Sequence, residues 1–209
     1  MTQAILWYFA DPMCSWCWGF SPIITQIKND YHDKLQIALN LGGLRPETTK
    51  AISTKDRDEV LHHWQDVQKI SGQEFNFDNA LADDFIYNTE PASRALVTFG
   101  KLDSENTLAL FHDIQYAFYV SQKDVTQQSI LLELAKKYTI DESEFISIFE
   151  SQETKDQTKQ HFANSRSAGV LGFPTLVFQH GKNHQFLSRG YASFEIIQQQ
   201  LDTLLNEVD

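Results

Sequence analysis

The sequence feature that most constrains the fold is a pair of cysteines, Cys14 and Cys17, at the junction of two differently patterned segments. Residues 5–10 are bulky and apolar and run into Asp11-Pro12, as expected of a buried strand that enters a turn. Apolar side chains then recur at helical spacing over residues 23–27. The cysteines are therefore expected at the first turn of a helix, where two intervening residues bring the sulfurs within disulfide distance.

The following segment completes the N-terminal unit. Residues 36–41 alternate polar and apolar side chains and stop at Gly42-Gly43, which is typical of a strand that ends in a turn. Parallel strands need a crossover connection, which is usually a helix. Residues 5–41 therefore predict a β-α-β unit and an α/β fold.

Helical patterning continues from about residue 53 to about residue 168. Pro91 suits the first turn of a helix and Gly100 suits its C-terminal cap. Asp141 and Glu144 match a capping box at the start of another helix. We find no convincing strand and no flexible linker in this region, which predicts an all-helical block packed as an insertion.

Strand patterning returns at residues 175–178 and, after four turn residues, near residues 185–188, which predicts a hairpin. Ser193 can cap a last helix whose apolar stripe extends to Val208. The predicted order is β-α-β, a helical block and β-β-α.

This order divides the chain into two parts. Residues 1–52 and 169–209 would form one discontinuous domain, and residues 53–168 would form the helical insertion. The chain has 209 residues, of which 42% are apolar, and this is enough for a packed core.

The formal charge of −11 excludes some classes of partner. Such a charge repels phosphate backbones and anionic lipid, so we expect neither a nucleic acid nor a membrane as partner. No basic residue precedes the apolar run at residues 5–10, and that run is too short for the core of a signal peptide. We therefore expect a cytoplasmic protein, and nothing in the sequence indicates its oligomeric state.

The helix position of the cysteines predicts a different role for each. Unpaired N–H groups and the positive end of the helix dipole stabilise a thiolate at the first position. Cys14 is therefore expected to attack as the thiolate. Cys17, one turn deeper and more buried, would resolve a mixed disulfide by attacking Cys14. This chemistry needs no bound cofactor.

Two plainer interpretations of the cysteines remain open. One is half of a zinc site, although the seven histidines offer few useful spacings: His62-His63 point apart on a helix, and His180 and His184 flank a turn. The other is a pair of unreactive buried thiols, which is less typical at a helix start. We expect no metal site.

A second motif, Gly172-Phe173-Pro174-Thr175, stands directly before the strand at residue 175. Proline cannot donate to a central ladder, so its place is the start of a strand. From the motif alone, the ordinary expectation is a trans peptide bond.

Together these segments resemble the DsbA family of the thioredoxin superfamily, and most of all its cytosolic FrnE-like branch. The resemblance extends over the whole chain and is carried by residues 11–20, 89–95, 130–135 and 169–175. It implies a thioredoxin-like fold with a central mixed sheet. It also implies that Cys14 is the nucleophile, that Cys17 is the resolving thiol, and that Pro174 is a cis residue packed against them.

The resemblance further implies where a substrate binds. Phe173 would present its backbone to a peptide or thiol, and the neighbouring surface would include Ser15, Trp16, Trp18 and Thr175. In this interpretation the two tryptophans are exposed beside the redox pair.

The sequence departs from related proteins in two respects. Ser15-Trp16 replaces the Pro-His pair of the periplasmic oxidases, so a strongly oxidising potential is not implied. Related proteins often carry an acid in the strand beneath the cysteines, whereas here residues 7–10 are Trp-Tyr-Phe-Ala and Asp11 is the only acid nearby.

The leading functional prediction is a cytosolic protein-disulfide oxidoreductase or isomerase that uses a Cys14-Cys17 disulfide. Its partners would be protein or small thiols, glutathione among them. The alternative is a glutathione-dependent isomerase or transferase of the kappa or hydroxychromene carboxylate isomerase type, which uses one Ser or Cys; the second thiol, Cys17, argues against it. A third alternative is a binding protein in which the cysteines are incidental.

Overall fold

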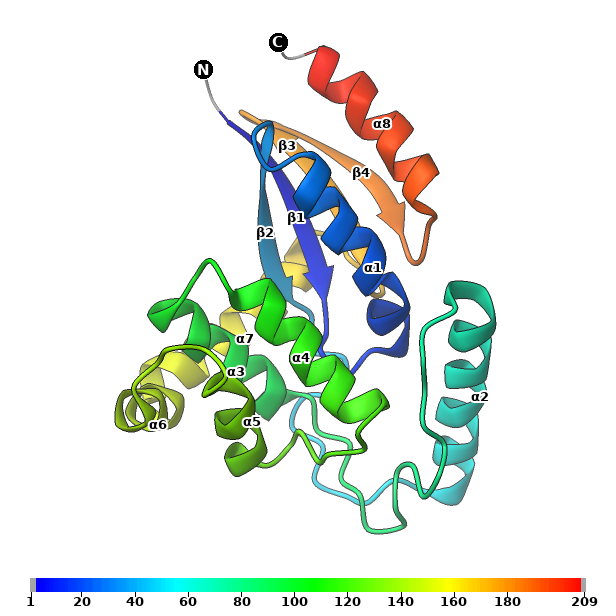
Figure 1. Cartoon of the computed structure of the whole chain (residues 1–209), viewed down its shortest axis with the longest axis vertical. Coiled ribbons are helices and arrows are strands. Elements are labelled where there is room, and N and C mark those ends of the chain that lie inside the picture. Colours follow the sequence, from blue (N-terminus) through cyan, green and yellow to red (C-terminus); the bar gives the residue numbers. More distant parts are fainter. Residues whose placement is uncertain (1–2, 208–209) are drawn as a thin grey trace.

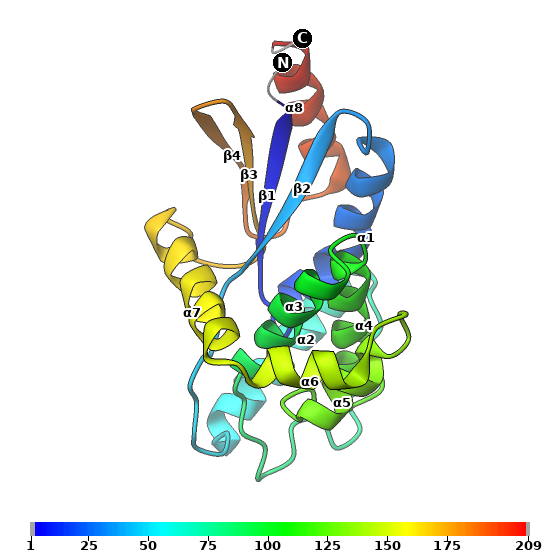
Figure 2. The same ribbon diagram turned by 90° about the vertical axis from the view of Figure 1, so that its left-hand side faces the viewer.

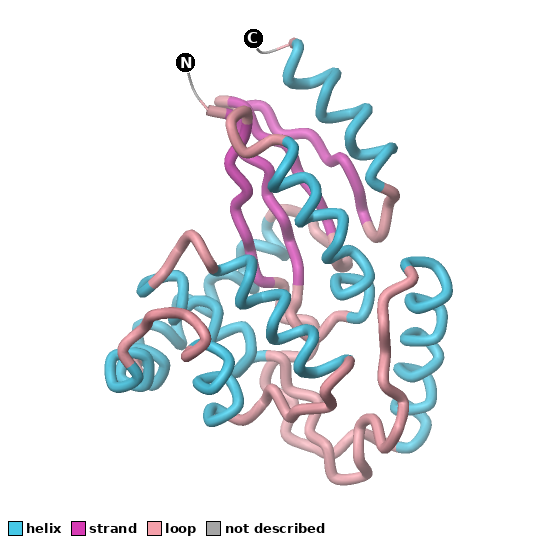
Figure 3. The backbone as a smooth tube through the Cα atoms, viewed as in Figure 1, coloured by secondary structure: helices cyan, strands magenta, loops and turns pink. Residues whose placement is uncertain are grey.

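A four-stranded mixed sheet forms the centre of the N- and C-terminal unit. The computed structural model describes residues 3–207, so Val208 lies outside the described residues. The strands are β1 (Ala4–Ala10), β2 (Leu35–Leu41), β3 (Thr175–His180) and β4 (Asn183–Arg189). Their order in the sheet is β2-β1-β3-β4 (Figure 3). β1 runs parallel to β2 and antiparallel to β3, and β4 completes a hairpin with β3.

Helices α1 (Ser15–Asp30) and α8 (Phe194–Asn206) pack beside this sheet (Figure 1). α1 buries the side chains of Ile23, Ile24 and Ile27, which is the stripe expected from the sequence. The β-α-β start, the hairpin and the final helix are thus confirmed. The fold is the predicted thioredoxin-like α/β arrangement.

Six helices lie between β2 and β3 in the sequence. They gather near the C-terminal ends of β1 and β2, the end of the sheet at which the cysteine segment follows β1 (Figures 1 and 2). They are α2 (Thr54–Ser71), α3 (Glu90–Leu102), α4 (Thr107–Tyr119), α5 (Gln128–Ala135), α6 (Glu142–Glu150) and α7 (Gln152–Ser167). The expected all-helical insertion is confirmed. Its side chains join those of the sheet unit in one contiguous buried cluster. The placing of domain boundaries at residues 52/53 and 168/169 stays a prediction.

Two of the expected helix caps have different outcomes. Asp141 accepts a hydrogen bond from the Glu144 backbone N–H at 2.8 Å, so α6 starts as expected. Gly100 does not end α3, which continues through Leu102 and is capped at Asp103. That expectation was wrong because Leu102 is one more partly buried residue that packs on the core, and its burial outweighs the weak helix propensity of glycine.

A side chain of the insertion replaces a helical hydrogen bond that a proline removes from α1. Pro22 has no N–H, so the carbonyl of Trp18, four residues earlier, loses its usual helical partner. The Gln73 side chain, just beyond α2, donates from Nε2 to that carbonyl at 3.1 Å and to Ser21 Oγ at 2.9 Å. The insertion therefore completes the hydrogen bonding of the helix that carries the cysteines.

Residues 3–207 lack two features. No helix in this range is long and apolar enough to cross a membrane. The same range has no group of three or more His, Cys, Asp or Glu side chains placed to hold a metal ion.

Candidate active site

The two cysteines occupy the first turn of α1. Cys14 is the N-cap residue, in extended conformation, and its carbonyl accepts hydrogen bonds from the N–H groups of Cys17 at 2.9 Å and Trp18 at 3.1 Å. Both thiols are free. Cys14 is 6% exposed and Cys17 is fully buried, so their order of depth is the one expected.

The Phe173-Pro174 segment lies against the first cysteine. Its peptide bond is cis, as the resemblance implies. The Cys14 Sγ donates to the Phe173 carbonyl at 3.6 Å, across 159 positions of sequence. β3 begins at Thr175, directly after Pro174. The antiparallel pairing of β1 with β3 brings the cysteine segment and the Phe173-Pro174 segment together.

The Phe173 ring lies directly over the backbone of Gly42. A Cβ atom at position 42 would stand 2.1 Å from Phe173 Cζ, which is far inside van der Waals contact. The neighbouring Gly43 has φ +68° and faces the Phe162 ring of α7. The paired glycines after β2 therefore allow two phenyl rings to approach the backbone closely.

Two further predicted substrate residues lie beside Cys14. Ser15 is the first residue of α1 and is partly exposed. Trp16 is also partly exposed, and its ring lies 5.9 Å from that of Tyr191, measured between centroids. Their side chains remain accessible next to Cys14.

Two other predicted substrate residues, Trp18 and Thr175, are buried, and the exposure expected for Trp18 was wrong. Trp18 is only 3% exposed because it stacks on Tyr119 of α4, and its Nε1 donates to the Glu74 carbonyl at 2.9 Å. Thr175 is 1% exposed, and its hydroxyl donates to the Gly172 carbonyl at 2.8 Å. Trp18 fastens α1 to the insertion, and Thr175 closes the turn before β3.

Asp11 has a positioning role that sequence reasoning did not identify. It is fully buried, and its two oxygens accept hydrogen bonds from the backbone N–H groups of Met13 at 2.9 Å and Leu44 at 2.7 Å. Burial raises the pKa of this carboxyl to about 6, against the opposing effect of those hydrogen bonds. Asp11 thus ties the turn that presents Cys14 to the loop after β2. An acid between a buried strand and a proline was the only available signal.

Buried tyrosines surround the pair. Tyr87 donates from its hydroxyl to the Met13 carbonyl at 2.5 Å. Tyr8, in β1, is fully buried, and its pKa is raised by burial and then by the nearby sulfurs of Cys17 and Cys14. The strand beneath the cysteines therefore places a buried phenol beside the two sulfurs.

The surroundings favour the protonated form of the inner thiol. Burial is the largest cause that raises the pKa of Cys17, and the neighbouring Cys14 raises it further. A hydrogen bond with the Asp11 backbone opposes these effects, and the charge of the Asp11 carboxylate adds a smaller effect that raises the pKa of Cys17. The arrangement combines an outer sulfur at a helix N-terminus with a deeper sulfur held as a thiol, which is a geometry suited to sequential thiol-disulfide exchange.

The chain as a whole is similar to proteins of a known family. The model of the DSBA-like thioredoxin domain matches residues 5–202. A crystal structure from Nitrosomonas europaea, of a protein provisionally assigned as a protein disulfide isomerase, is 41% identical, covers 98% of both chains and superposes with a TM-score of 0.93.

A second similar structure is the cytosolic disulfide reductase DsbM from Pseudomonas aeruginosa. It is 26% identical, with a TM-score of 0.81 over 97% of this chain and 98% of DsbM. Its form with GSH is 25% identical, with a TM-score of 0.79 over 97% and 99% of the two chains.

Among curated proteins, the ClpXP adapter protein SpxH of Bacillus subtilis is 23% identical over 180 residues. The match covers 83% of this chain and 57% of SpxH. The SpxH of Halalkalibacterium halodurans is similar, at 21% identity and 58% of its length. The chain therefore spans less than three fifths of the length of these relatives.

Proposed function

Because the chain belongs to the DSBA-like thioredoxin domain family, we propose that it is a protein-disulfide oxidoreductase that acts through Cys14 and Cys17. One observation carries the proposal: the chain's two cysteines are free thiols in the first turn of α1, with the outer sulfur in contact with the Phe173 carbonyl. If the two thiols had no function, this contact between the end of β1 and the start of β3 would not be expected. The FrnE-like branch remains part of this proposal.

In the direction of reduction, the Cys14 thiolate attacks one sulfur of a substrate disulfide. A Cys14-substrate disulfide forms, and the other substrate sulfur leaves as a thiolate. Cys17 then loses its proton and attacks the Cys14 sulfur, which releases the second substrate thiolate and forms the Cys14-Cys17 disulfide. Two electrons have passed to the substrate, and an external thiol must supply two electrons to restore the dithiol.

Glutathione is the external thiol that we propose, because DsbM, the cytosolic reductase described above, has been observed with GSH. Two molecules of glutathione would reduce the Cys14-Cys17 disulfide and leave as glutathione disulfide. DsbM also supports a cytoplasmic location and the direction of reduction for this chain. The same chemistry run in reverse would oxidise a dithiol.

A substrate would bind along the segment before Pro174. The Phe173 backbone N–H has no hydrogen-bond partner within residues 3–207 and can pair with an extended peptide. Ser15 and Trp16, which remain partly exposed beside Cys14, would contact the same peptide. We therefore propose Phe173, Ser15 and Trp16 as substrate-binding residues.

The direct test is equilibration of the purified protein with glutathione redox buffers, followed by thiol alkylation and mass measurement. The proposal expects one reversible intramolecular disulfide that links Cys14 and Cys17. A stable single glutathione adduct with no internal disulfide would instead support the glutathione-dependent isomerase or transferase. Thiols that stay reduced in every buffer would contradict both enzymes.

An adapter function is the second candidate, and the similarity to SpxH favours it. If the chain acts by binding alone and does not use its thiols, replacing both cysteines by serine would leave binding of its partner intact. An oxidoreductase would lose all turnover in that variant. The double variant therefore separates the two functions.

A further inference from the structure

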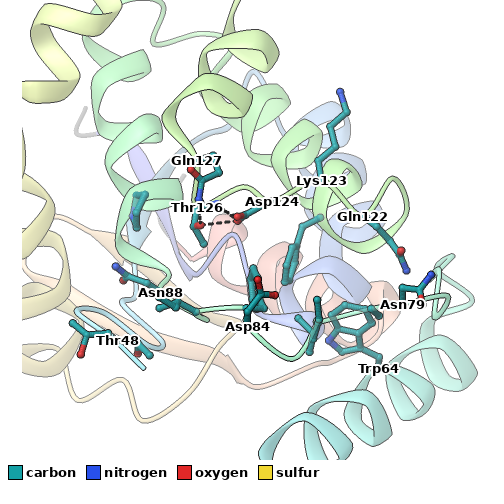
Figure 4. A pocket seen from close by; sticks show the side chains of 18 residues that line it. Thr48, Trp64, Asn79, Asp84, Asn88, Gln122, Lys123, Asp124, Thr126 and Gln127 are labelled. Atoms are coloured by element: carbon teal, nitrogen blue, oxygen red, sulfur yellow. Dashed lines mark hydrogen bonds between the residues drawn. The ribbon is translucent and has the colours of Figure 1, made fainter. Parts of the chain in front are cut away.

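The structure has a large cavity away from the redox pair. It has a volume of about 690 Å³ and lies between α2, the loop before α3 and the segment that joins α4 to α5 (Figure 4). Cys14, Cys17 and Phe173 are not among its lining residues. A volume of this size is typical of sites that hold small organic molecules or short peptide segments.

One part of the cavity is aromatic. Trp64, Phe85 and Phe118 line it, and Leu81 adds an aliphatic side chain. Figure 4 shows Trp64 at one end near Asn79 and Gln122, whereas Thr48 and Asn88 lie at the other end. The cavity is therefore suited to an elongated ligand with an apolar body.

Trp64 also carries an unused hydrogen-bond donor. The residue is 1% exposed, and its Nε1–H has no acceptor among residues 3–207. Its ring neighbours are the aromatic side chains of Phe75, Phe77, Phe118 and Tyr119. A buried donor without a partner costs free energy, and Trp64 is a lining residue of the cavity, so a ligand that supplies an acceptor there would recover part of that cost.

Backbone conformation singles out the same region. Asn79, Leu81 and Gln122 line the cavity and have φ between 52° and 55°. Glu47, with φ 60°, is the residue before the lining residue Thr48. No other residue of 3–207 apart from glycines has a positive φ. Residues held in this region cluster at ligand sites, because the surrounding structure must offset their cost.

The charges of the cavity favour a cation. The Asp84 carboxylate is exposed in the middle of the lining and has no hydrogen bond or ion pair within the described part of the chain (Figure 4). Asp124 is also negative, although its oxygens already accept hydrogen bonds from Thr126 and Gln127. Lys123 is the cavity's only cation among these residues. It extends away from Asp84 and pairs with Glu133 at 2.7 Å.

We propose that this cavity binds an organic cation with an apolar body. The apolar part would lie against Phe85, Phe118 and Trp64, with a ligand acceptor facing the Trp64 Nε1–H. The ammonium or guanidinium group would pair with Asp84. Such a group could belong to a Lys or Arg side chain of a peptide or to a free amine. The site is separate from the redox pair and does not depend on the proposed function.

The test is a titration of the reduced, ¹⁵N-labelled protein followed through its tryptophan side-chain N–H resonances. The probes are the peptide acetyl-Phe-Arg-Leu-amide, its counterpart with neutral citrulline in place of Arg, and 2-phenylethylamine. The Trp64 resonance, assigned with Trp64→Phe, should shift on titration. Those of Trp7 and Trp18 should not, because their N–H groups already donate to Gln179 and Glu74.

Matched variants test the charge. Asp84→Asn should weaken binding of the cationic probe about threefold to fivefold, as expected for a partly exposed ion pair. Asp83→Asn, one residue earlier, removes an exposed carboxylate that pairs with Arg57 and does not line the cavity, so binding should be unchanged. Both variants should fold, because both side chains are exposed.

The outcomes are distinct. Binding of the Arg peptide but not of the amine supports a peptide side chain as the source, and equal binding of both supports a free amine as well. No shift of the Trp64 resonance with either cation at millimolar concentration would overturn the proposal. Equal affinity for the citrulline peptide, or no effect of Asp84→Asn, would overturn the assignment of a cation.

Discussion

Adding one methyl group at Gly42 should disturb the site through Phe173. In Gly42→Ala, the new Cβ would stand 2.1, 2.4 and 2.5 Å from three atoms of the Phe173 ring. Carbon atoms in contact are about 3.5–4.0 Å apart, so the ring must move by more than about 1 Å. Overpacking of this kind costs about 1–3 kcal/mol. Because φ of Gly42 is not positive, the backbone accepts alanine without strain. Alanine also reduces the conformational entropy of the unfolded chain, which offsets up to about 1 kcal/mol of this loss.

We therefore expect Gly42→Ala to lower the free energy of unfolding by about 1–2 kcal/mol, measured by urea denaturation of the reduced protein. It should also slow thiol-disulfide exchange, followed with a fluorogenic disulfide peptide, because the Phe173 carbonyl contacts Cys14 Sγ. Phe173→Ala removes the clashing ring, so the methyl group should cost much less in that background. Gly172→Ala is the matched control, since no atom lies within 4 Å of its added Cβ.

The reasoning fails if Gly42→Ala unfolds at the same urea concentration as the parent protein and exchanges at the same rate. It also fails if the double-mutant cycle with Phe173→Ala gives no coupling, since ring and methyl group would then be energetically independent. A loss of stability in Gly172→Ala as large as in Gly42→Ala would show that general sensitivity of these loops, and not the contact, is measured.

Three further predictions follow from other contacts. Folding raises the Asp11 pKa from 3.8 to about 6, so the native state binds this proton more tightly than the unfolded state does. The free energy of unfolding should therefore fall by up to about 3 kcal/mol as the pH rises from about 4 to 6. Asp11→Asn should lack this step in pH-dependent urea unfolding, and identical pH profiles would contradict the assignment. Cys14→Ser should abolish exchange and Cys17→Ser should accumulate mixed disulfides detectable by mass, whereas turnover of a dithiol substrate by Cys17→Ser at the parent rate would exclude a resolving thiol. Gln73→Ala should lower the free energy of unfolding, measured by thermal denaturation, by about 1–2 kcal/mol, because it leaves the Trp18 carbonyl unpaired. The loss should be smaller in a Pro22→Ala background, which restores a backbone donor. An equal loss in both backgrounds would refute this pairing.

The spacing of apolar residues, together with the turn and cap residues between them, was enough to predict the order of helices and strands. The apolar strand before Asp11, the stripe after Cys17 and the hairpin around residues 180–183 are local patterns, and each element occurs where its pattern indicates. Gly100 shows the limit of local reasoning, because burial of Leu102 continues the helix past a residue that is often a cap.

The residues around the cysteines were less predictable because their state depends on partners far away in sequence. Trp18 is buried by Tyr119 and by the Glu74 carbonyl, both contributed by the insertion. Asp11 has its role through Leu44, on a loop that the sequence does not place beside it. Local pattern identifies a reactive motif, but tertiary contacts decide which of its side chains face a substrate.

The long separation between Cys14 and Phe173 also matters while the protein is being made. A ribosome that adds about 5–20 residues per second needs roughly 8–30 s to proceed from Cys17 to Pro174. During this interval the nascent chain carries both thiols but lacks β3 and the Phe173-Pro174 segment before it, which lies against Cys14 in the folded protein. The thiols are then open to oxidants and to disulfides of other proteins. A chain of this topology thus acquires Cys14, the nucleophile of the proposed exchange, long before it acquires the segment proposed to bind the substrate.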